Sequence, residues 1–430
     1  MKITNNNQAF TDNSNDVDEN TIFISSKQNK KFEQNAIDAS CKEIIKDKDL
    51  KNYFDFSSIK VVGITGTNGK TTTAAAIYSM LLDLGYKVAF QGTRGFYVND
   101  MQMQEYSLTT PVQLKIFSNI QLAINYECDF FIMEVSSHAL AQNRICGLEF
   151  ALKIHTNITR DHLDYHKTLQ EYIDIKNSFF NDNAPKLINK DDKNVKFKMK
   201  NALSYGLDNP STYKVQAFSF KNGTAVAMQY FGELYHFASD LRGTFNVYNL
   251  TCAVAAVHTL TKKPLQEVCD TVDNFAGVAG RMQIVNDTPH IVVDFAHTPD
   301  GMKSVFDSFK DKDIIAVFGA GGNRDTKKRA IMGKIANEYA KHIVVTSDNP
   351  RFEDPTLISE QICSGIHDKS KLTQELNRKE AIKIAINKSK EFEHPVILIL
   401  GKGDEKEQII YDKKIPLNDK DIVEEFFKED

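Results

Sequence analysis

The sequence predicts an α/β protein with three domains, in which mostly parallel sheets are covered by helices. Two observations carry this prediction. From residue 58 onward, short apolar runs alternate with longer helical patterns, as in doubly wound parallel sheets. A glycine-rich turn at 66–71 joins the first of these runs to a helix. We therefore divide the chain into an N-terminal module at 1–57, a central domain at 58–278 and a C-terminal domain at 279–430.

The composition is that of an ordinary globular protein, with 430 residues of which 41% are hydrophobic and 26% are charged. A net charge of −4 gives no support for a nucleic-acid partner or a membrane surface. No apolar stretch is long enough for membrane insertion, and the first residues lack the apolar segment of a secretory signal. The six cysteines show no C-x-x-C spacing, so we expect reduced thiols in a cytoplasmic protein.

The N-terminal module is polar and rich in Asn, Asp and Lys. Within it, Thr21–Ser25 is typical of a strand and Asn35–Ile45 is typical of a helix. This is too little apolar sequence for a core of its own, so we expect a small module packed on the following domain.

The central domain opens with the pattern of a phosphate-binding loop. An apolar run at 61–64 indicates a buried strand, and 74–82 indicates a helix. Between them, glycines let the backbone approach phosphate groups, and N–H groups at the helix N-terminus point at the anion. Lys70 supplies a positive charge, and the Thr71 hydroxyl suits Mg²⁺. The common pattern has a glycine where Ile64 stands, so an ordinary glycine-rich turn is the alternative.

Strands and helices alternate through the rest of the central domain. Apolar runs predict strands at 87–91, 129–135 and 151–157, and helical patterns occur at 113–125, 169–180, 246–260 and 265–275. Short strand patterns separated by Lys-Asn-Gly and Gly-Glu turns predict an antiparallel meander on the sheet edge, at 213–220, 224–231 and 234–237.

The C-terminal domain repeats the alternation without a phosphate loop of its own. Its predicted strands are 290–295, 313–319, 342–346 and 395–400, and its predicted helices are 326–339, 378–390 and 419–427. The run Gly-Val-Ala-Gly at 277–280 predicts a hinge between the two larger domains.

Glu134 lies at the end of an apolar strand. In open α/β sheets, ligands bind beyond the carboxyl ends of the strands. A carboxylate there, facing the loop that carries Thr71, is well placed to hold Mg²⁺. The alternative is a surface carboxylate at a strand end.

Residues 159–166 hold two His, two Asp and one Arg directly after a predicted strand. His162 and His166 have the spacing of zinc ligands on a helix, but the glutamate of that motif is replaced by Leu163. The neighbouring carboxylates favour Mg²⁺ or phosphate chemistry. A polar strand-to-helix loop is the alternative.

Three polar loops follow strands of the C-terminal domain, at 319–325, 348–351 and 401–405. The first is similar to a dinucleotide-binding turn, and the second contains Asn-Pro, a common turn dipeptide. Because loops at one sheet end lie together, these three predict a substrate pocket.

Taken together, these segments resemble the Mur ligases over nearly the whole chain. The matching motifs are Thr-Gly-Thr-Asn-Gly-Lys-Thr-Thr (65–72), Leu-Thr-Thr-Pro (108–111), Glu-Val-Ser-Ser-His-Ala-Leu (134–140), Thr-Arg-Asp-His-Leu-Asp-Tyr-His (159–166), Phe-Asn-Val-Tyr-Asn-Leu (245–250), Gly-Arg-Met-Gln (280–283), Asp-Phe-Ala-His-Thr-Pro-Asp (294–300), Asp-Asn-Pro-Arg (348–351) and Gly-Lys-Gly-Asp-Glu (401–405). The family loop is Gly-x-x-Gly-Lys-Thr, which accounts for Ile64.

The resemblance implies a reaction and a domain plan. ATP phosphorylates a carboxylate of UDP-N-acetylmuramoyl-L-alanyl-D-glutamate, and the amine of meso-2,6-diaminopimelate displaces the phosphate, in cytoplasmic peptidoglycan precursor synthesis. A monomer is expected. The N-terminal module would bind UDP, the central domain would be P-loop ATPase-like, and the C-terminal domain would be Rossmann-like.

The resemblance also implies roles for single residues. The nucleotide contacts are Gly66, Thr67, Asn68, Gly69, Lys70, Thr71, Thr72, Arg281, Asp294 and His297. The metal contacts are Thr71, Glu134, His162 and a carbamylated Lys176, and with Lys70 the last three form the catalytic set. Without the family, Lys176 would be interpreted as a helix-surface lysine.

For the two organic substrates, the resemblance implies two further groups of residues. The UDP-muramoyl peptide contacts are Ser14, Thr109, Thr110, Ser136, Gln142 and Arg144. The diaminopimelate contacts are Arg324, Asp348, Asn349, Pro350, Arg351, Gly401 and Glu405. A guanidinium at Arg351 suits the distal carboxylate of diaminopimelate, which lysine lacks. The chain departs from the family at Asn15, where Arg is usual, and at Asp404, where His is common.

Two alternatives remain open from the sequence. A folylpolyglutamate synthetase-like ligase shares the phosphate loop, although the N-terminal module and Asp-Asn-Pro-Arg speak against it. A P-loop switch without enzymatic activity is the other, although it does not need Glu134, His162 and three pocket loops.

Overall fold

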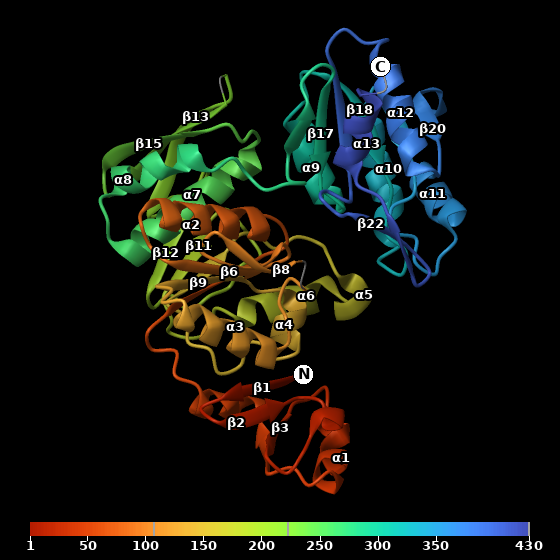
Figure 1. Cartoon of the computed structure of the whole chain (residues 1–430). Coiled ribbons are helices and arrows are strands. Elements are labelled where there is room, and N and C mark those ends of the chain that lie inside the picture. Colours follow the sequence, from red (N-terminus) through yellow and green to blue (C-terminus); the bar gives the residue numbers. More distant parts are fainter. Residues whose placement is uncertain (106–107, 222, 429–430) are drawn as a thin grey trace.

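Three sheets of four or more strands, together with a two-stranded ribbon, are present in the computed structural model, which describes residues 1–105, 108–221 and 223–428. A four-stranded sheet lies near the N-terminus, an eleven-stranded sheet in the middle and a six-stranded sheet near the C-terminus (Figure 1). Both larger sheets are mostly parallel and carry helices on their faces, so the predicted α/β class is confirmed. None of the helices in these residues has the length and apolarity to cross a bilayer.

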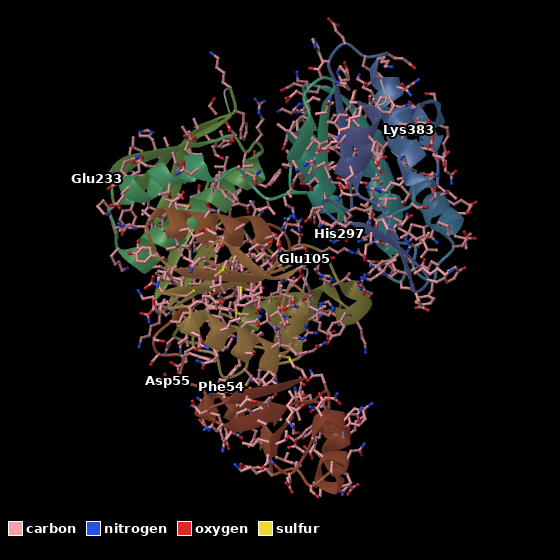
Figure 2. The ribbon with its side chains drawn as sticks, viewed as in Figure 1. Phe54, Asp55, Glu105, Glu233, His297 and Lys383 are labelled. Atoms are coloured by element: carbon pink, nitrogen blue, oxygen red, sulfur yellow. The ribbon has the colours of Figure 1, made fainter. Side chains whose placement is uncertain are left out.

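The N-terminal module is a small sheet whose strands lie in the order β1-β2-β3-β4. Its elements are β1 (Lys2–Asn5), β2 (Gln8–Thr11), β3 (Thr21–Ser25), α1 (Glu33–Asp38) and β4 (Glu43–Lys46), with 3₁₀ turns at Ser14–Asp16, Lys30–Phe32 and Asp47–Tyr53. Its core includes Phe10 and Phe54, which pack with Leu114 and Phe117 of α3 in the central domain. Figure 2 places Phe54 where the two units meet.

One prediction for this module is wrong. The helix expected at Asn35–Ile45 ends at Asp38, and the chain then turns through Ser40, whose φ is +62°. The last residues of the expected helix belong to β4, where Ile44 pairs with Phe23 of β3. Their apolar side chains complete the sheet, and this tertiary pairing outweighs the local helical pattern.

The central sheet has a parallel middle and two antiparallel edges, in the order β15-β14-β13-β12-β11-β10-β5-β9-β6-β7-β8. The strands are β5 (Lys60–Thr65), β6 (Val88–Gly92), β7 (Gly95–Val98), β8 (Met101–Glu105), β9 (Phe130–Glu134), β10 (Leu152–His155), β11 (Lys186–Asn189), β12 (Ala202–Gly206), β13 (Tyr213–Ser219), β14 (Thr224–Tyr230) and β15 (Glu233–Ser239). The predicted meander is present as β13–β15, and the middle of its first turn, Asn222, lies outside the described residues.

Helices cover both faces of the central sheet (Figure 1). They are α2 (Lys70–Asp83), α3 (Gln113–Asn125), α4 (Ser137–Ala141), α5 (Leu163–His166), α6 (Leu169–Ser178), α7 (Thr244–Thr261) and α8 (Leu265–Asp270), the last continuing as a 3₁₀ turn at Thr271–Asn274. Val62 packs with α2 and α7, whereas its neighbour Val61 packs with α3 on the opposite face. This burial on both faces explains why the strand sequences are almost continuously apolar.

The C-terminal sheet has the order β16-β17-β21-β18-β19-β20, with only β16 antiparallel. Its strands are β16 (Gln283–Asn286), β17 (His290–Asp294), β18 (Asp313–Phe318), β19 (His342–Val345), β20 (Leu372–Gln374) and β21 (Pro395–Leu400), beside a ribbon of β22 (Glu407–Ile410) and β23 (Lys413–Pro416). The helices are α9 (Pro299–Asp307), α10 (Lys327–Tyr339), α11 (Pro355–Cys363), α12 (Arg378–Ser389) and α13 (Asp419–Phe426). The first three cover one face and the last two cover the other.

Candidate functional site

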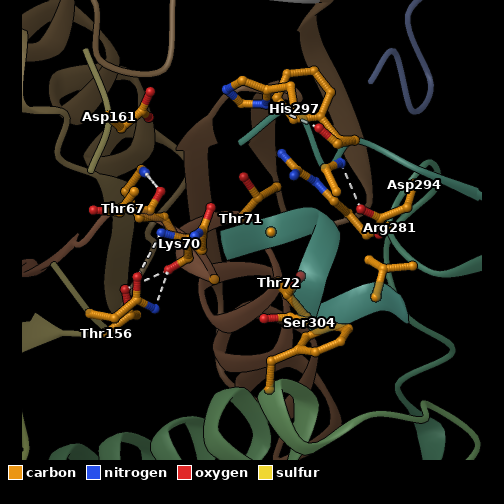
Figure 3. A pocket seen from close by; sticks show the side chains of 18 of the residues that line it. Thr67, Lys70, Thr71, Thr72, Thr156, Asp161, Arg281, Asp294, His297 and Ser304 are labelled. Carbon is orange, nitrogen blue, oxygen red and sulfur yellow. Dashed lines mark hydrogen bonds between the residues drawn. The ribbon is translucent and has the colours of Figure 1, made fainter. Parts of the chain in front are cut away.

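A cavity of about 670 Å³ lies where the central and C-terminal domains face each other. The central domain lines it with the phosphate loop, Glu134 and His162, and the C-terminal domain lines it with loops that carry His297 and Arg351. Figure 3 shows Lys70 and Thr71 on α2 with Arg281, Asp294 and His297 across from them. The loops therefore meet at strand ends, as expected for ligand sites in α/β sheets.

The phosphate loop leads directly into α2, which begins at Lys70 rather than at the predicted residue 74. Gly69 has a φ of +83°, and a Cβ atom there would lie 2.4 Å from Oδ1 of Asn249, so only glycine fits. The Lys70 ammonium donates to the carbonyl oxygens of Gly66 and Thr67 at 2.7 and 2.8 Å. Burial lowers the pKa of Lys70, against the attraction of Glu134 and Asp161.

Thr71 and Glu134 are in direct contact. Thr71 Oγ1 donates to Glu134 Oε2 at 2.9 Å, and the backbone N–H of Thr93 donates to Oε1 at 2.9 Å. Glu134 is fully buried, and a Cβ atom on Gly92 would lie 2.2 Å from its Oε1. A hydroxyl beside a buried carboxylate supplies the oxygen ligands that Mg²⁺ prefers. These residues therefore fit a Mg²⁺ ion that takes its other ligands from phosphate and water.

His162 follows Asp161 in the loop before α5, with a φ of +50°. Its backbone N–H donates to Asp161 Oδ1 at 2.8 Å, and its Nε2 lies 3.3 Å from Oδ2. Burial lowers the pKa of His162 to about 4 despite Asp161, so the ring is neutral near pH 7 and can offer a lone pair.

The zinc interpretation of this loop gains no support. His166 Nε2 lies 2.9 Å from the Ser137 hydroxyl instead of turning toward a site shared with His162. Within the described part of the chain, no group of three or more His, Cys, Asp or Glu side chains is arranged to hold a metal.

Lys176 is buried, with 1% of its surface exposed, so the interpretation as a helix-surface lysine is wrong. Its Nζ donates to the carbonyl oxygen of Gly66 at 2.8 Å and lies 5.1 Å from the centre of the Tyr172 ring. Burial and then the positive charge of Lys70 hold the pKa of Lys176 well below its usual range, against Asp161. Lys176 forms no ion pair with a carboxylate among the described residues. It lies behind the phosphate loop and is not among the cavity lining.

Asp294 links the domain linker to β17. Its Oδ2 accepts from the N–H of Met282 and its Oδ1 from the N–H of Ala296, both at 2.7 Å. Burial raises the pKa of this carboxyl group, against Arg281. The Arg281 guanidinium lies 4.3 Å from the centre of the Phe295 ring, so it faces the cavity from a fixed position.

Lys328 on α10 is a cavity residue that no sequence pattern indicated. Its Nζ donates to the carbonyl oxygen of His297 at 2.9 Å. Burial lowers its pKa, although the carboxylates of Asp161 and Asp348 oppose this. His297 is also buried, and this burial lowers its pKa to about 4. A lysine in the first turn of a polar helix gives no sequence signal that it faces a cavity.

Arg351 and Arg324 line the cavity from the C-terminal domain. Arg351 has a φ of +52°, and its Nη1 donates to the carbonyl oxygen of Gly322 at 3.0 Å. It forms no ion pair within the described residues, and burial followed by repulsion from Arg324 lowers its pKa. Arg324 Nη1 lies 3.5 Å from Oδ2 of Asp164 in the central domain. The two guanidinium groups therefore lie close enough to repel each other, with the carboxylates of Asp348 and Glu405 nearby.

The loop 401–405 is tied to Asn349. Asn349 Nδ2 donates to Glu405 Oε2 at 2.8 Å, and its Oδ1 accepts from Lys402 Nζ at 3.2 Å. A Cβ atom on Gly401 would lie 2.7 Å from Asp348 Oδ2. Asp348, Asn349, Gly401 and Glu405 therefore lie together along the cavity, whereas Pro350 is not part of its lining.

Four of the residues expected to hold the UDP-muramoyl peptide form a hydrogen-bonded network, namely Thr110, Ser136, Gln142 and Arg144. Thr110 Oγ1 donates to the Glu134 carbonyl and accepts from the Ser136 N–H, both at 2.9 Å, and Arg144 binds the Thr110 carbonyl at 2.6 Å. Arg144 also donates to Gln142 Oε1 at 2.7 Å. Of the expected group only Thr109 lines the cavity, and Ser14 stays within the N-terminal module.

The fold and the site together define a phosphate-loop protein with a second α/β domain facing the loop. The chain belongs to the Mur ligase family. Residues 64–257 match the Mur ligase middle domain, and residues 280–403 match the domain described as Mur ligase, glutamate ligase domain.

The chain is similar in sequence to curated relatives over almost its full length. A protein of Wolinella succinogenes named UDP-N-acetylmuramoyl-L-alanyl-D-glutamate–2,6-diaminopimelate ligase is 51% identical, over 97% of this chain and 95% of that protein. A Helicobacter pylori protein of the same name is 47% identical, over 97% of this chain and 95% of that protein.

Solved structures show the same fold. A structure titled as a UDP-N-acetylmuramoyl-L-alanyl-D-glutamate–2,6-diaminopimelate ligase has a TM-score of 0.68 and 28% identity, covering 98% of this chain and 94% of that one. A Mycobacterium tuberculosis folylpolyglutamate synthase titled as complexed with ADP and AMPPCP has a TM-score of 0.65 and 15% identity, covering 80% of this chain and 89% of that one. The second likeness concerns the fold alone.

Proposed function

We propose that the chain is the ATP-dependent ligase that joins meso-2,6-diaminopimelate to UDP-N-acetylmuramoyl-L-alanyl-D-glutamate. One observation carries this proposal: the Arg351 guanidinium of the Asp-Asn-Pro-Arg turn lines the same cavity as the phosphate loop, without a carboxylate partner among the described residues. The names of the relatives point the same way. The reaction belongs to peptidoglycan precursor synthesis, and we place it in the cytoplasm, with the protein acting as a monomer.

ATP binds in this proposal with its phosphates on residues 66–72. The backbone N–H groups at the start of α2 face the anion, and Lys70 leaves its carbonyl partners to reach the terminal phosphate. Arg281, Asp294 and His297 hold the nucleotide from the C-terminal domain. Thr71 and Glu134 would hold one Mg²⁺ ion and His162 a second, and the chemistry that such ions would supply is neutralisation of phosphate charge.

The peptide substrate presents its D-glutamate carboxylate to the terminal phosphate of ATP. A carboxylate is a poor electrophile, so its oxygen first takes the phosphoryl group, and ADP leaves. The amine of diaminopimelate then attacks the acyl carbon, the C–O bond to phosphate breaks, and the nitrogen releases a proton to solvent. Lys70 and the loop N–H groups stabilise the negative charge that moves in the first step.

Lys176 is carbamylated in this proposal. A lysine reacts with CO₂ only as the neutral amine, and burial beside Lys70 favours that form. The resulting carboxylate would form next to Gly66, behind the phosphate loop, and its proposed role is to position the second metal ion.

Diaminopimelate is recognised by charge. Arg351 and Arg324 attract its distal carboxylate, and the fork of Arg351 would repel the ammonium group that lysine carries near that position. Asp348, Asn349, Gly401 and Glu405 shape the pocket, Pro350 restricts the turn that carries Arg351, and the carboxylate of Glu405 suits an ammonium group. Ser14, Thr109, Thr110, Ser136, Gln142 and Arg144 hold the UDP-muramoyl peptide.

Phosphate release separates this proposal from its two alternatives. The proposed ligase releases phosphate from ATP only with the UDP-muramoyl dipeptide and meso-diaminopimelate together. A folylpolyglutamate synthetase-like enzyme would need a folate and glutamate, and a nucleotide switch would hydrolyse ATP without an amino acid. Release that depends on folate, or that needs no amino acid, overturns the assignment.

A further inference from the structure

Arg94 and Asp404 form an ion pair between the central and C-terminal domains. Arg94 lies in the turn between β6 and β7, and Asp404 lies in the loop between β21 and β22. The Arg94 Nη1 is 2.5 Å from Asp404 Oδ2, and it also donates to the carbonyl oxygen of Ala279 at 3.0 Å. One guanidinium group therefore contacts the opposite domain and the linker at 277–280 that joins the two domains.

Each member of this pair is next to a residue of the site. Thr93, before Arg94, donates its N–H to Glu134, and its hydroxyl lies 3.0 Å from the hydroxyl of Thr109. Glu405, after Asp404, accepts from Asn349 and from Lys402. The ion pair thus joins the turn that positions the buried Glu134 to the loop that carries Glu405.

Backbone packing restricts motion at the same place. Gly280 and Gly403 have φ values of +69° and +55°. A Cβ atom on Gly280 would lie 2.1 Å from the backbone nitrogen of Asp404, and one on Gly403 would lie 2.7 Å from the Gly280 oxygen. Because Gly280 at the end of the linker touches the 401–405 loop through its backbone, the two would move together in a rotation about residues 277–279, and such a rotation would disturb the Arg94–Asp404 pair.

We propose that Arg94 and Asp404 are an interdomain positioning pair, which sets the distance between the two halves of the site. It holds the 401–405 loop against the turn that contacts Glu134, so that the acceptor amine and the activated carboxylate meet in one geometry. Neither residue needs to touch a substrate. Only the expected change in kcat/KM rests on the proposed ligase function.

Within the described residues, two other ion pairs cross the same boundary. Arg160 lies 3.3 Å from Asp325, and Arg324 lies 3.5 Å from Asp164. Both are longer, and Arg324 belongs to the proposed amino-acid pocket, so it must leave Asp164 when a carboxylate binds. The Arg94–Asp404 pair involves no proposed substrate contact and can persist through the reaction.

A double-mutant cycle tests the pair with Arg94→Gln, Asp404→Asn, the double variant and the charge swap Arg94→Asp/Asp404→Arg. Kinetics are measured at saturating ATP, together with the radius of gyration from small-angle scattering and the thermal midpoint. Lys87→Gln and Glu127→Gln are matched controls, because they remove equal charges from an exposed pair inside the central domain.

We expect each single variant to lower kcat/KM for the amino acid by about 3- to 10-fold, with the double variant no worse than either single one. The swap should restore much of the loss, and high salt should reduce the wild-type advantage because both side chains are partly exposed. The thermal midpoint should stay within the range of the controls, and the radius of gyration of the single variants should rise.

Additive losses in the double variant, or losses equal to those of the controls, overturn the positioning pair. Scattering needs no substrate, so it separates this inference from the proposed function. If the variants have a larger radius of gyration but the protein does not use diaminopimelate, the positioning pair is retained and the proposed function is overturned. If the protein uses diaminopimelate but the variants change neither the radius of gyration nor the kinetics, the proposed function is retained and the positioning pair is overturned.

Discussion

The side-chain nitrogen of Lys176 lies 2.8 Å from the carbonyl oxygen of Gly66, at the start of the phosphate loop. This contact links α6 to the loop through a lysine that has no ion-pair partner among the described residues. A buried amine without a counter-charge is most stable in its neutral form. The contact therefore places a buried amine with a lowered pKa directly behind the residues that are proposed to hold phosphate.

Lys176→Ala should lose activity by about 10²-fold or more, because the proposed carbamate carboxylate disappears. Short-chain carboxylates such as acetate should restore part of the activity of this variant when added to the assay. Lys176→Arg, which cannot be carbamylated, serves as a control that carboxylates do not rescue. Full activity of Lys176→Ala, or activity that carboxylates leave unchanged, contradicts the proposed role.

Glu134→Gln should lower kcat by about 10²-fold and raise the Mg²⁺ concentration needed for half-maximal activity. The amide keeps the size of the side chain but removes the charge that faces Thr71. A magnesium titration of the wild type and the variant makes the comparison. Glu127→Gln, the same change at an exposed position, should leave the titration unaltered. Identical magnesium curves for Glu134→Gln and the wild type would exclude the metal role.

Acid should destabilise the free protein between pH 6.5 and about pH 4. The pKa values of His138, His162 and His297 are lowered to about 4, in each case chiefly by burial. In this window the unfolded chain binds more protons than the folded one, so the free energy of unfolding falls as pH falls. Above pH 6.5 these histidines are neutral in both states and contribute no slope. Thermal midpoints at pH 7, 6 and 5 measure the effect.

The histidine contribution can be isolated with His297→Asn, which cannot be protonated in this range. Its thermal midpoint should depend less steeply on pH between 6.5 and 4 than that of the wild type. An equal slope in the two proteins would show that His297 does not carry the lowered pKa.

Arg351→Ala should lower kcat/KM for meso-diaminopimelate by about 10²-fold, because the distal carboxylate loses its charged partner. Arg351→Lys should recover only part of this loss, since an ammonium group lacks the planar fork. ADP affinity, measured by calorimetry, should be the same in all three proteins. Unchanged kcat/KM in Arg351→Ala would remove the basis for substrate choice at this residue.

Sequence patterns were sufficient for the long parallel strands such as β5, β9, β18 and β21, because those strands are buried on both faces and read as apolar runs. The same patterns missed the parallel strands β11, β12 and β20, which are short and include polar residues. They were not sufficient where pairing partners decide the structure. The residues of β4 look helical until Ile44 is placed beside Phe23. β8 is exposed along its whole length and belongs to the sheet only through its pairing with β7.

The candidate site shows the same division. Lys70, Thr71 and Glu134 follow strands in recognisable motifs, and the structure brings Thr71 and Glu134 into contact. Burial of Lys176 and Lys328 has no local signature, because each lies on a polar helix and its surroundings come from distant segments. The role of Asp404 was open from the sequence, since its partner Arg94 is 310 residues away.

The central claim is that the chain adds meso-diaminopimelate to the UDP-muramoyl dipeptide. The most direct measurement is the kcat/KM of the wild-type protein for meso-diaminopimelate and for L-lysine, followed as ADP release at saturating ATP and dipeptide. A preference for meso-diaminopimelate of about 10²-fold or more is the predicted result. Equal use of the two amino acids, or a preference for L-lysine, would contradict it.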